Sequence, residues 1–295
     1  MRDDLRPYDR EGRVQVPGGD VWYGVCGDLS QGLPLVVIHG GPGMSHDYLR
    51  PLGDLADERA VIFYDQLDAG RSDRPNDPVN WHVARFLEEI EALTSALALT
   101  RYIAFGNSWG GTLAAAHAAR KPDGLAGAVL SSPLLHTDTW IADNAAYRAA
   151  LPADVQAVMD HHETQGTTDD PAYLGAVDRF YQRHLCRAVP WPAYVERTFE
   201  VLNPECYEAM WGPNEFTCTG VLKGYDGMPA LAGIRVPALV TCGRYDEATP
   251  ASTERFAAMI PHATFRVFPH SSHMAFVEER ADYVKTMRDW MHTLA

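Results

Sequence analysis

Short apolar runs that alternate with helical segments are the feature of this sequence that most narrows its possible folds. Residues 34–39 and 59–65 are such runs, and glycine or polar residues follow each of them, which is typical of buried strands. Residues 80–98 carry apolar side chains at helical spacing. The alternation continues with a strand at 101–105, an alanine-rich helix at 112–120 and a strand at 127–131. Strands that alternate with helices predict a mostly parallel sheet with helices on both faces.

The alternation is interrupted once, after Pro133. The stretch that follows is mostly helical in pattern and rich in aromatic residues, and it contains no clear strand. Strand patterns return at 237–243 and 264–268, before a final amphipathic helix at 280–292. The sequence therefore predicts one α/β core, made of residues 1–135 and 224–295, with a helical cap inserted at 136–223.

A Gly-x-Ser-x-Gly pattern lies where a predicted strand meets a predicted helix. The pattern consists of Gly106, Ser108 and Gly110. A serine on such a sharp, strained turn is the nucleophile elbow of the α/β-hydrolase fold, and side chains at the two glycine positions would collide with the turn. A glycine-rich turn with an idle serine is the alternative. The strand-to-helix context favours Ser108 as a nucleophile.

Two further polar residues follow predicted strands. Asp246 comes after the strand at 237–243, and His273 comes after the strand that ends near Phe268. Ligands bind at the carboxyl ends of strands in open parallel sheets, and Ser, Asp, His is the chain order of α/β-hydrolase triads. We therefore predict that His273 accepts the Ser108 proton and that Asp246 orients His273. His270 is the nearest alternative base.

A glycine-rich segment, His39-Gly-Gly-Pro-Gly43, follows the first predicted strand. Acyl transfer builds negative charge on the carbonyl oxygen, and backbone N–H groups aimed at that oxygen stabilise it. We predict that the N–H groups of Gly41 and Trp109 form this oxyanion hole. The alternatives are a simple tight turn and a phosphate cradle, but the segment lacks the Lys and Ser/Thr of a P-loop.

Composition excludes several classes of function. The formal net charge of −14 makes nucleic acid and anionic lipid unlikely partners. The five cysteines are odd in number and form no Cys-x-x-Cys pair, so we expect no disulfide framework. No His-Glu-x-x-His motif occurs either, and we expect no metal or other cofactor. The N-terminus has no apolar signal-peptide region, and no apolar stretch approaches the ~20 residues of a membrane span. A cytoplasmic location is favoured.

Over nearly its whole length, the sequence resembles the proline iminopeptidases and the related aminopeptidase that works beside the tricorn protease. The stretches that carry the resemblance are His39-Gly-Gly-Pro-Gly-Met-Ser-His-Asp-Tyr48, Tyr64-Asp-Gln-Leu-Asp-Ala-Gly-Arg-Ser72, Gly106-Asn-Ser-Trp-Gly-Gly111, Trp211-Gly-Pro-Asn-Glu-Phe216, Gly243-Arg-Tyr-Asp-Glu247 and Ser272-His-Met-Ala-Phe276. The resemblance implies removal of one N-terminal residue, often proline. It also implies that Glu215, Glu247 and Tyr207 recognise the substrate amine.

The resemblance has one departure. The family usually carries glycine at the position of Asp68 and often cysteine at that of Ala69. We expect Asp68 either to add a carboxylate near the mouth of the site or to lie in solvent.

These observations together predict a metal-free serine aminopeptidase that acts through an acyl-enzyme on short peptides, amides or anilides with a free N-terminal amine. One alternative is an amino-acid amidase, an ester hydrolase or a general esterase of the same fold. Another is a ligand receptor that retains a slow triad.

Overall fold

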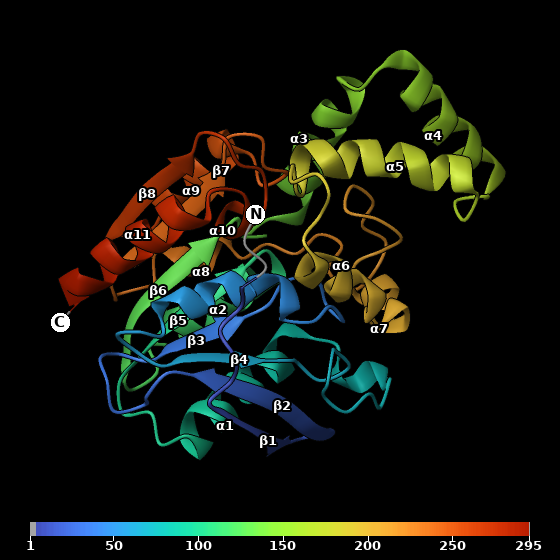
Figure 1. Ribbon diagram of the computed structural model, residues 1–295. Coiled ribbons are helices and arrows are strands. Elements are labelled where there is room, and N and C mark those ends of the chain that lie inside the picture. Colours follow the sequence, from blue (N-terminus) through green and yellow to red (C-terminus); the bar gives the residue numbers. More distant parts are fainter. Residues whose placement is uncertain (1–3, 295) are drawn as a thin grey trace.

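The protein is built around an 8-stranded sheet (Figure 1). The structure is a computed structural model and describes residues 4–294. The strand order is β1-β2-β4-β3-β5-β6-β7-β8. The strands are β1 (Arg10–Val16), β2 (Gly19–Cys26), β3 (Leu35–Ile38), β4 (Val61–Tyr64), β5 (Tyr102–Asn107), β6 (Leu125–Ser131), β7 (Ala238–Gly243) and β8 (Ala263–Phe268). The six strands from β3 to β8 run parallel, as the sequence predicted.

Helices cover both faces of this sheet because its central strands are apolar on both sides. In β3, Val36 packs into one hydrophobic cluster and Val37 into another. Helices α1 (Val83–Ala96), α2 (Trp109–Ala119) and α9 (Pro250–Ala258) contribute to the first cluster, and α11 (Arg280–Met291) contributes to the second. This arrangement confirms the predicted fold class. The shorter helices of the core are η1 (Asp47–Leu55), η2 (Pro78–Asn80), α8 (Met228–Leu231), α10 (Ala275–Glu278) and η3 (His292–Leu294).

The N-terminal hairpin of β1 and β2 was not identified from the sequence. Both strands are antiparallel to their partners: β2 pairs with β1 on one side and with β4 on the other. The edge strand β1 is mostly exposed and polar, so its sequence lacks the apolar run that marks β3 and β4.

Between β6 and β7, five helices lie within residues 136–223. They are α3 (Thr137–Ala149), α4 (Ala153–Gln165), α5 (Pro171–His184), α6 (Ala193–Glu200) and α7 (Pro204–Met210). Helices α4 and α5 pack on each other and project away from the sheet, whereas α6 packs on η1 (Figure 1). Phe216 joins residues of α4 and α5 in a small hydrophobic cluster separate from the two clusters at the sheet. The assignment of 136–223 as a functional cap remains a prediction.

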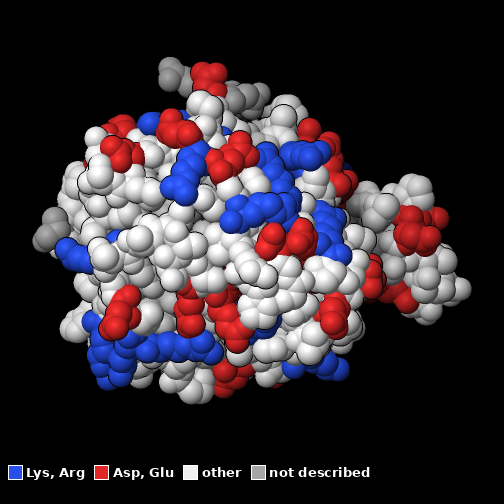
Figure 2. Space-filling model, turned by 90° about the horizontal axis from the view of Figure 1, so that it is seen from below, with Lys and Arg blue, Asp and Glu red and all other residues white. Residues whose placement is uncertain are grey.

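Charged side chains of both signs lie together on one face of the protein. Figure 2 shows a face on which groups of Lys and Arg lie directly beside Asp and Glu. Within residues 4–294, no helix combines the length and apolar character needed to cross a bilayer.

Candidate active site

Ser108 lies on a strained turn between β5 and α2. Its backbone dihedrals are φ 55° and ψ −120°, a region that residues with a side chain rarely adopt. A Cβ atom on Gly106 would lie 2.0 Å from the carbonyl oxygen of Gly110, and one on Gly110 would lie 2.1 Å from that of Ile38. The structure therefore supports the steric reason for glycine on both sides of Ser108.

Asp246 follows β7, and all of its hydrogen bonds are made inside the protein. Its Oδ1 accepts from His273 Nδ1 at 2.8 Å and from the Ala248 N–H at 2.8 Å. Its Oδ2 accepts from the Ser132 hydroxyl at 2.6 Å and from the Gly243 N–H at 3.1 Å. Because Nδ1 of His273 faces this carboxylate, Nδ1 carries the ring proton and Nε2 is left as the acceptor that a general base needs.

Ser108 and His273 line the same small cavity, of about 20 Å³. The cavity also contains Glu215 and Glu247, and its remaining lining residues are Gly40, Gly41, Met44, Tyr48, Asn107, Leu185, Phe199 and Met274. His270 does not line it: this residue is exposed, and its backbone N–H donates to Glu279. Four of the five predicted catalytic and carboxylate residues therefore come together in one cavity, and Asp246 lies directly behind His273.

The predicted oxyanion-hole residues flank Ser108. Gly41 has a φ of +50°, and together with Ser108 and Trp109 it lines a second small cavity. A Cβ atom on Gly40 would lie 2.8 Å from the Cβ of Ser108, so only glycine lets this loop approach the serine so closely. Trp109 is the first residue of α2, and the N–H groups of a first helical turn have no acceptor within the helix.

Glu247 is a buried carboxylate with no hydrogen-bond partner. Only 1% of its surface is exposed, and neither carboxylate oxygen has a hydrogen-bonding partner among residues 4–294. Its Oε1 lies 3.7 Å from His273 Nδ1. Burial raises the pKa of Glu247 well above its usual value, and the neighbouring charges of Glu215 and Asp246 raise it further. An unpaired carboxylate in such a place is costly unless a cation or a proton joins it.

Glu215 approaches the same cavity from the segment that follows α7. Its Oε1 accepts from the Tyr207 hydroxyl at 2.5 Å, and its backbone carbonyl accepts from Trp140 Nε1 at 2.9 Å. Burial raises the pKa of Glu215, while the Tyr207 hydrogen bond and His273 oppose that rise. Tyr207 bonds to Glu215, eight residues later, and Glu215 shares the cavity with Glu247, which comes from a different part of the chain.

The expectation for Asp68 was wrong, because its side chain is fully buried and does not lie at the mouth or in solvent. Its carboxylate accepts from Trp81 Nε1 at 2.8 Å and from the Asn76 N–H at 2.7 Å. Its φ is +65°, a conformation that favours glycine. Asp68 therefore holds a turn, and its positive φ gives a reason for glycine at this position in the family that the sequence resembles.

Sequence reasoning gave no role to Ser132, Tyr48 or Asn107. Ser132 follows β6 and donates to Asp246. The Tyr48 hydroxyl accepts from the Gly40 N–H at 2.7 Å and donates to Asn107 Oδ1 at 2.7 Å. The position of Ser132 at the carboxyl end of a strand was the one signal that could have identified it. No local pattern marks Tyr48, because its partner lies 59 residues away.

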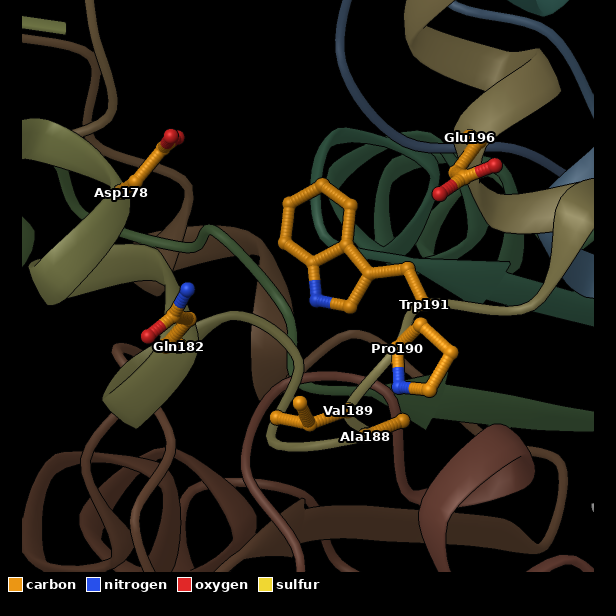
Figure 3. A pocket seen from close by; sticks show the side chains of 7 residues that line it. All are labelled: Asp178, Gln182, Ala188, Val189, Pro190, Trp191 and Glu196. Carbon is orange, nitrogen blue, oxygen red and sulfur yellow. The ribbon is translucent and has the colours of Figure 1, made fainter. Parts of the chain in front are cut away.

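A separate surface pocket, of about 160 Å³, lies between α5 and α6 (Figure 3). It is lined by Asp178, Gln182, Ala188, Val189, Pro190, Trp191 and Glu196. None of the predicted site residues lines this pocket. Among residues 4–294, no group of three or more His, Cys, Asp and Glu side chains is arranged to hold a metal ion.

Comparison with known proteins identifies the family to which the chain belongs. A model of the alpha/beta hydrolase fold matches residues 34–280. The proline iminopeptidase of Heyndrickxia coagulans is 39% identical over 96% of this chain and 99% of its own length. The crystal structure of VinJ superposes with a TM-score of 0.95 at 39% identity, covering 98% of this chain and 100% of VinJ. That of proline iminopeptidase from Mycobacterium smegmatis gives a TM-score of 0.91 at 34% identity, covering 97% and 98%. The chain therefore belongs to the proline iminopeptidase family of α/β hydrolases.

Proposed function

We propose that this protein is a serine aminopeptidase that releases an N-terminal residue, proline or another apolar residue, from short peptides, amides or anilides. The observation that carries the proposal is the unpaired, buried carboxylate of Glu247, which faces the same cavity as Ser108 and His273. The names of the relatives, which are proline iminopeptidases, agree with this chemistry. An enzyme that needed only acyl chemistry would have no use for such a carboxylate.

The acyl-transfer step uses the serine and its two partners. Ser108 Oγ attacks the carbonyl carbon, and Nε2 of His273 takes its proton. Asp246 holds the Nδ1 proton of His273 and stabilises the imidazolium that forms. His273 then protonates the leaving amine as the bond breaks, and an aminoacyl-enzyme remains. Water attacks the ester by the same steps in reverse order.

The negative charge that develops on the substrate's carbonyl oxygen needs hydrogen-bond donors close to Ser108. The N–H groups of Gly41 and Trp109 are the proposed donors, since both residues line a cavity with the serine. Each such donor typically contributes ~3 kcal/mol of transition-state stabilisation.

The substrate ammonium group would bind between the proposed acyl site and the two glutamates. Glu247 has no hydrogen-bond partner among residues 4–294, and one oxygen of Glu215 accepts from Tyr207. An ammonium group placed there would compensate both carboxylates and lower their pKa values toward the usual range. Its own desolvation, which costs several kcal/mol in an apolar site, would be offset by the same pair.

We also propose that residues 136–223 act as a cap over this site. Trp140, Phe199, Tyr207 and Glu215 belong to that segment, and each lines one of the two small cavities at Ser108. A site closed in this way admits a chain end more readily than the middle of a folded protein. Cleavage of internal bonds in a long N-acetylated peptide would contradict the cap proposal.

The test combines labelling with a substrate panel. A serine-directed phosphonate should inactivate the enzyme and add one label at Ser108, and Ser108→Ala should take no label. Ser30→Ala is a matched control, since Ser30 is exposed and bonds only to Asp28. Prolyl, alanyl and phenylalanyl p-nitroanilides should be cleaved. The turnover of amino-acid amides and esters is measured for comparison. Turnover no higher than that of Ser108→Ala would overturn the enzyme assignment in favour of a receptor. Preference for simple esters would favour a general esterase.

A further inference from the structure

Gln66 is a fully buried amide that the mechanism above does not use. It follows β4, and its side chain bonds to both segments that carry the proposed oxyanion donors. Its Oε1 accepts from Trp109 Nε1 at 2.9 Å, and its Nε2 donates to the His39 carbonyl oxygen at 2.8 Å. An indole N–H can only donate and a carbonyl oxygen can only accept, so these partners fix the orientation of the amide without ambiguity.

The Gln66 backbone fixes the His39 ring as well. Its N–H donates to His39 Nε2 at 3.0 Å, so Nε2 carries no proton and Nδ1 does. Burial lowers the pKa of His39 to about 4, which keeps the ring neutral. His39 Nδ1 therefore donates to the Gly40 carbonyl oxygen, 2.9 Å away.

The hydrogen bond to Gly40 controls the direction of a proposed oxyanion donor. The carbonyl of Gly40 and the N–H of Gly41 belong to one planar peptide unit, so holding the carbonyl sets the direction of the N–H. The Gln66 backbone thus acts on the Gly41 N–H through the His39 ring, and the Gln66 side chain holds the His39 carbonyl on one side and the Trp109 indole on the other. No other side chain among residues 4–294 is recorded as bonding to both His39 and Trp109.

From these contacts we infer that Gln66 is a positioning residue that couples the two halves of the oxyanion hole. The inference rests on the proposed function only in taking Gly41 and Trp109 as the oxyanion donors. A primary amide suits the task because it accepts on one side and donates on the other, whereas an ionised carboxylate cannot donate and an apolar side chain does neither. A misalignment of a few tenths of an ångström would weaken the donors in the transition state and leave ground-state binding nearly unchanged.

The experiment compares Gln66→Met with wild type on p-nitrophenyl acetate, an ester that needs the oxyanion hole but has no amine. We expect kcat to fall by ~10- to 100-fold with KM within about threefold, on the scale of a displaced oxyanion donor. Binding of a simple alkylboronic acid, whose tetrahedral adduct on Ser108 places an oxygen in the hole, should weaken in parallel. Tyr102→Phe is the matched control: it removes the buried Tyr102–His117 hydrogen bond far from the site and should leave kcat unchanged.

Trp109→Phe keeps an aromatic ring but removes the indole N–H together with part of the indole, and it carries the test if Gln66→Met does not fold. We expect a smaller fall in kcat, about 3- to 10-fold. In the Gln66→Met background the same change should have almost no further effect, since its partner is already gone. Folded single variants with wild-type kcat, independent effects that multiply, or a boronic acid affinity that does not change would each overturn the inference. The ester has no amine, so this assay tests the role of Gln66 even if the aminopeptidase proposal is wrong.

Discussion

Two adjacent residues of the active site, Asp246 and Glu247, are both buried carboxylates but have opposite surroundings. Asp246 receives hydrogen bonds from a histidine, a serine and two backbone N–H groups. Glu247, one residue later, receives none within the described chain. The carboxylate of Asp246 is therefore fully hydrogen-bonded by the protein itself, whereas that of Glu247 is not.

This contrast separates a structural part of the site from a recognition part. Hydrogen bonds that favour the ionised form stabilise the charge of a carboxylate, and burial without them destabilises it. Asp246 is therefore ready to orient His273 before any substrate arrives. Glu247 keeps a free energy cost that a bound ammonium group would remove, and the proposed recognition of a free N-terminus rests on this cost.

The largest expected effect is on the acyl-transfer part. Ser108→Ala and His273→Ala should each lower kcat by ~10³-fold or more while the protein stays folded. The residues act as a unit, so the double variant should be little worse than either single variant. Single-turnover kinetics on prolyl p-nitroanilide would measure this. Near wild-type turnover by Ser108→Ala would contradict the assignment of Ser108 as the nucleophile.

The next effect concerns recognition. Glu247→Gln should lower kcat/KM for free-amine substrates by ~10²- to 10³-fold, on the scale of ~3–5 kcal/mol for breaking a buried ion pair. Hydrolysis of p-nitrophenyl acetate should change far less, because that ester has no amine to recognise. Glu254→Gln, which removes an exposed carboxylate of α9, controls for the change in net charge. Equal losses on both substrates would place Glu247 in the acyl chemistry instead.

The two neighbours should also differ in the sign of their effect on stability. Asp246→Asn should lower the free energy of unfolding by about 2 kcal/mol, because an amide nitrogen cannot accept from Ser132 or Gly243. Glu247→Gln should raise it by ~1 kcal/mol near pH 8, because the variant no longer has to bury an unpaired charge or to take up a proton in order to avoid doing so.

The pH dependence of the Glu247 effect follows from its raised pKa. Between the unfolded pKa of ~4.3 and the higher folded value, the folded protein keeps a proton that the unfolded chain releases, so wild-type stability falls as pH rises. The advantage of Glu247→Gln should therefore grow from pH 4 toward pH 8. Urea unfolding at a series of pH values would measure it, and an advantage that is largest at pH 4 would contradict the account.

The smallest effect is expected for Tyr207→Phe. The Tyr207 hydroxyl lowers the pKa of Glu215 by donating to its Oε1, so its loss should leave a larger fraction of Glu215 protonated. Binding of the ammonium substrate should weaken by ~10-fold or less, the scale of one hydrogen bond to a charged group. The deficit in KM should shrink as pH rises through the pKa of Glu215. A deficit that grew with pH would show that Tyr207 acts by another route.

The parts of this fold that sequence reasoning predicted share one property: they are locally encoded. Strands β3 to β7 are buried apolar runs, and the turn at Ser108 is fixed by glycines two residues away on each side. The hairpin of β1 and β2 was not predicted from the sequence, because β1 lies at the edge of the sheet and carries polar side chains.

The remaining site features depend on contacts between distant residues. Buried Asp68 accepts a hydrogen bond from Trp81, 13 residues later, so its sequence position alone suggested only a carboxylate near the mouth of the site or in solvent. Gln66 meets Trp109 across 43 residues, and Ser132 meets Asp246 across 114. Such pairings follow from strand order in the sheet, which local patterns do not encode. The sequence could name Glu215 and Glu247 only through the family resemblance.

The central claim is that a free N-terminal amine is recognised by an unpaired carboxylate beside the acyl site. The most direct measurement is the ratio of kcat/KM for prolyl p-nitroanilide to that for its N-acetylated form, taken for wild type and for Glu247→Gln. The account predicts a wild-type ratio of several powers of ten that falls by ~10²- to 10³-fold in the variant, because much of the discrimination is lost with the charge. A wild-type ratio near one, or a large ratio that the variant retains, would contradict it.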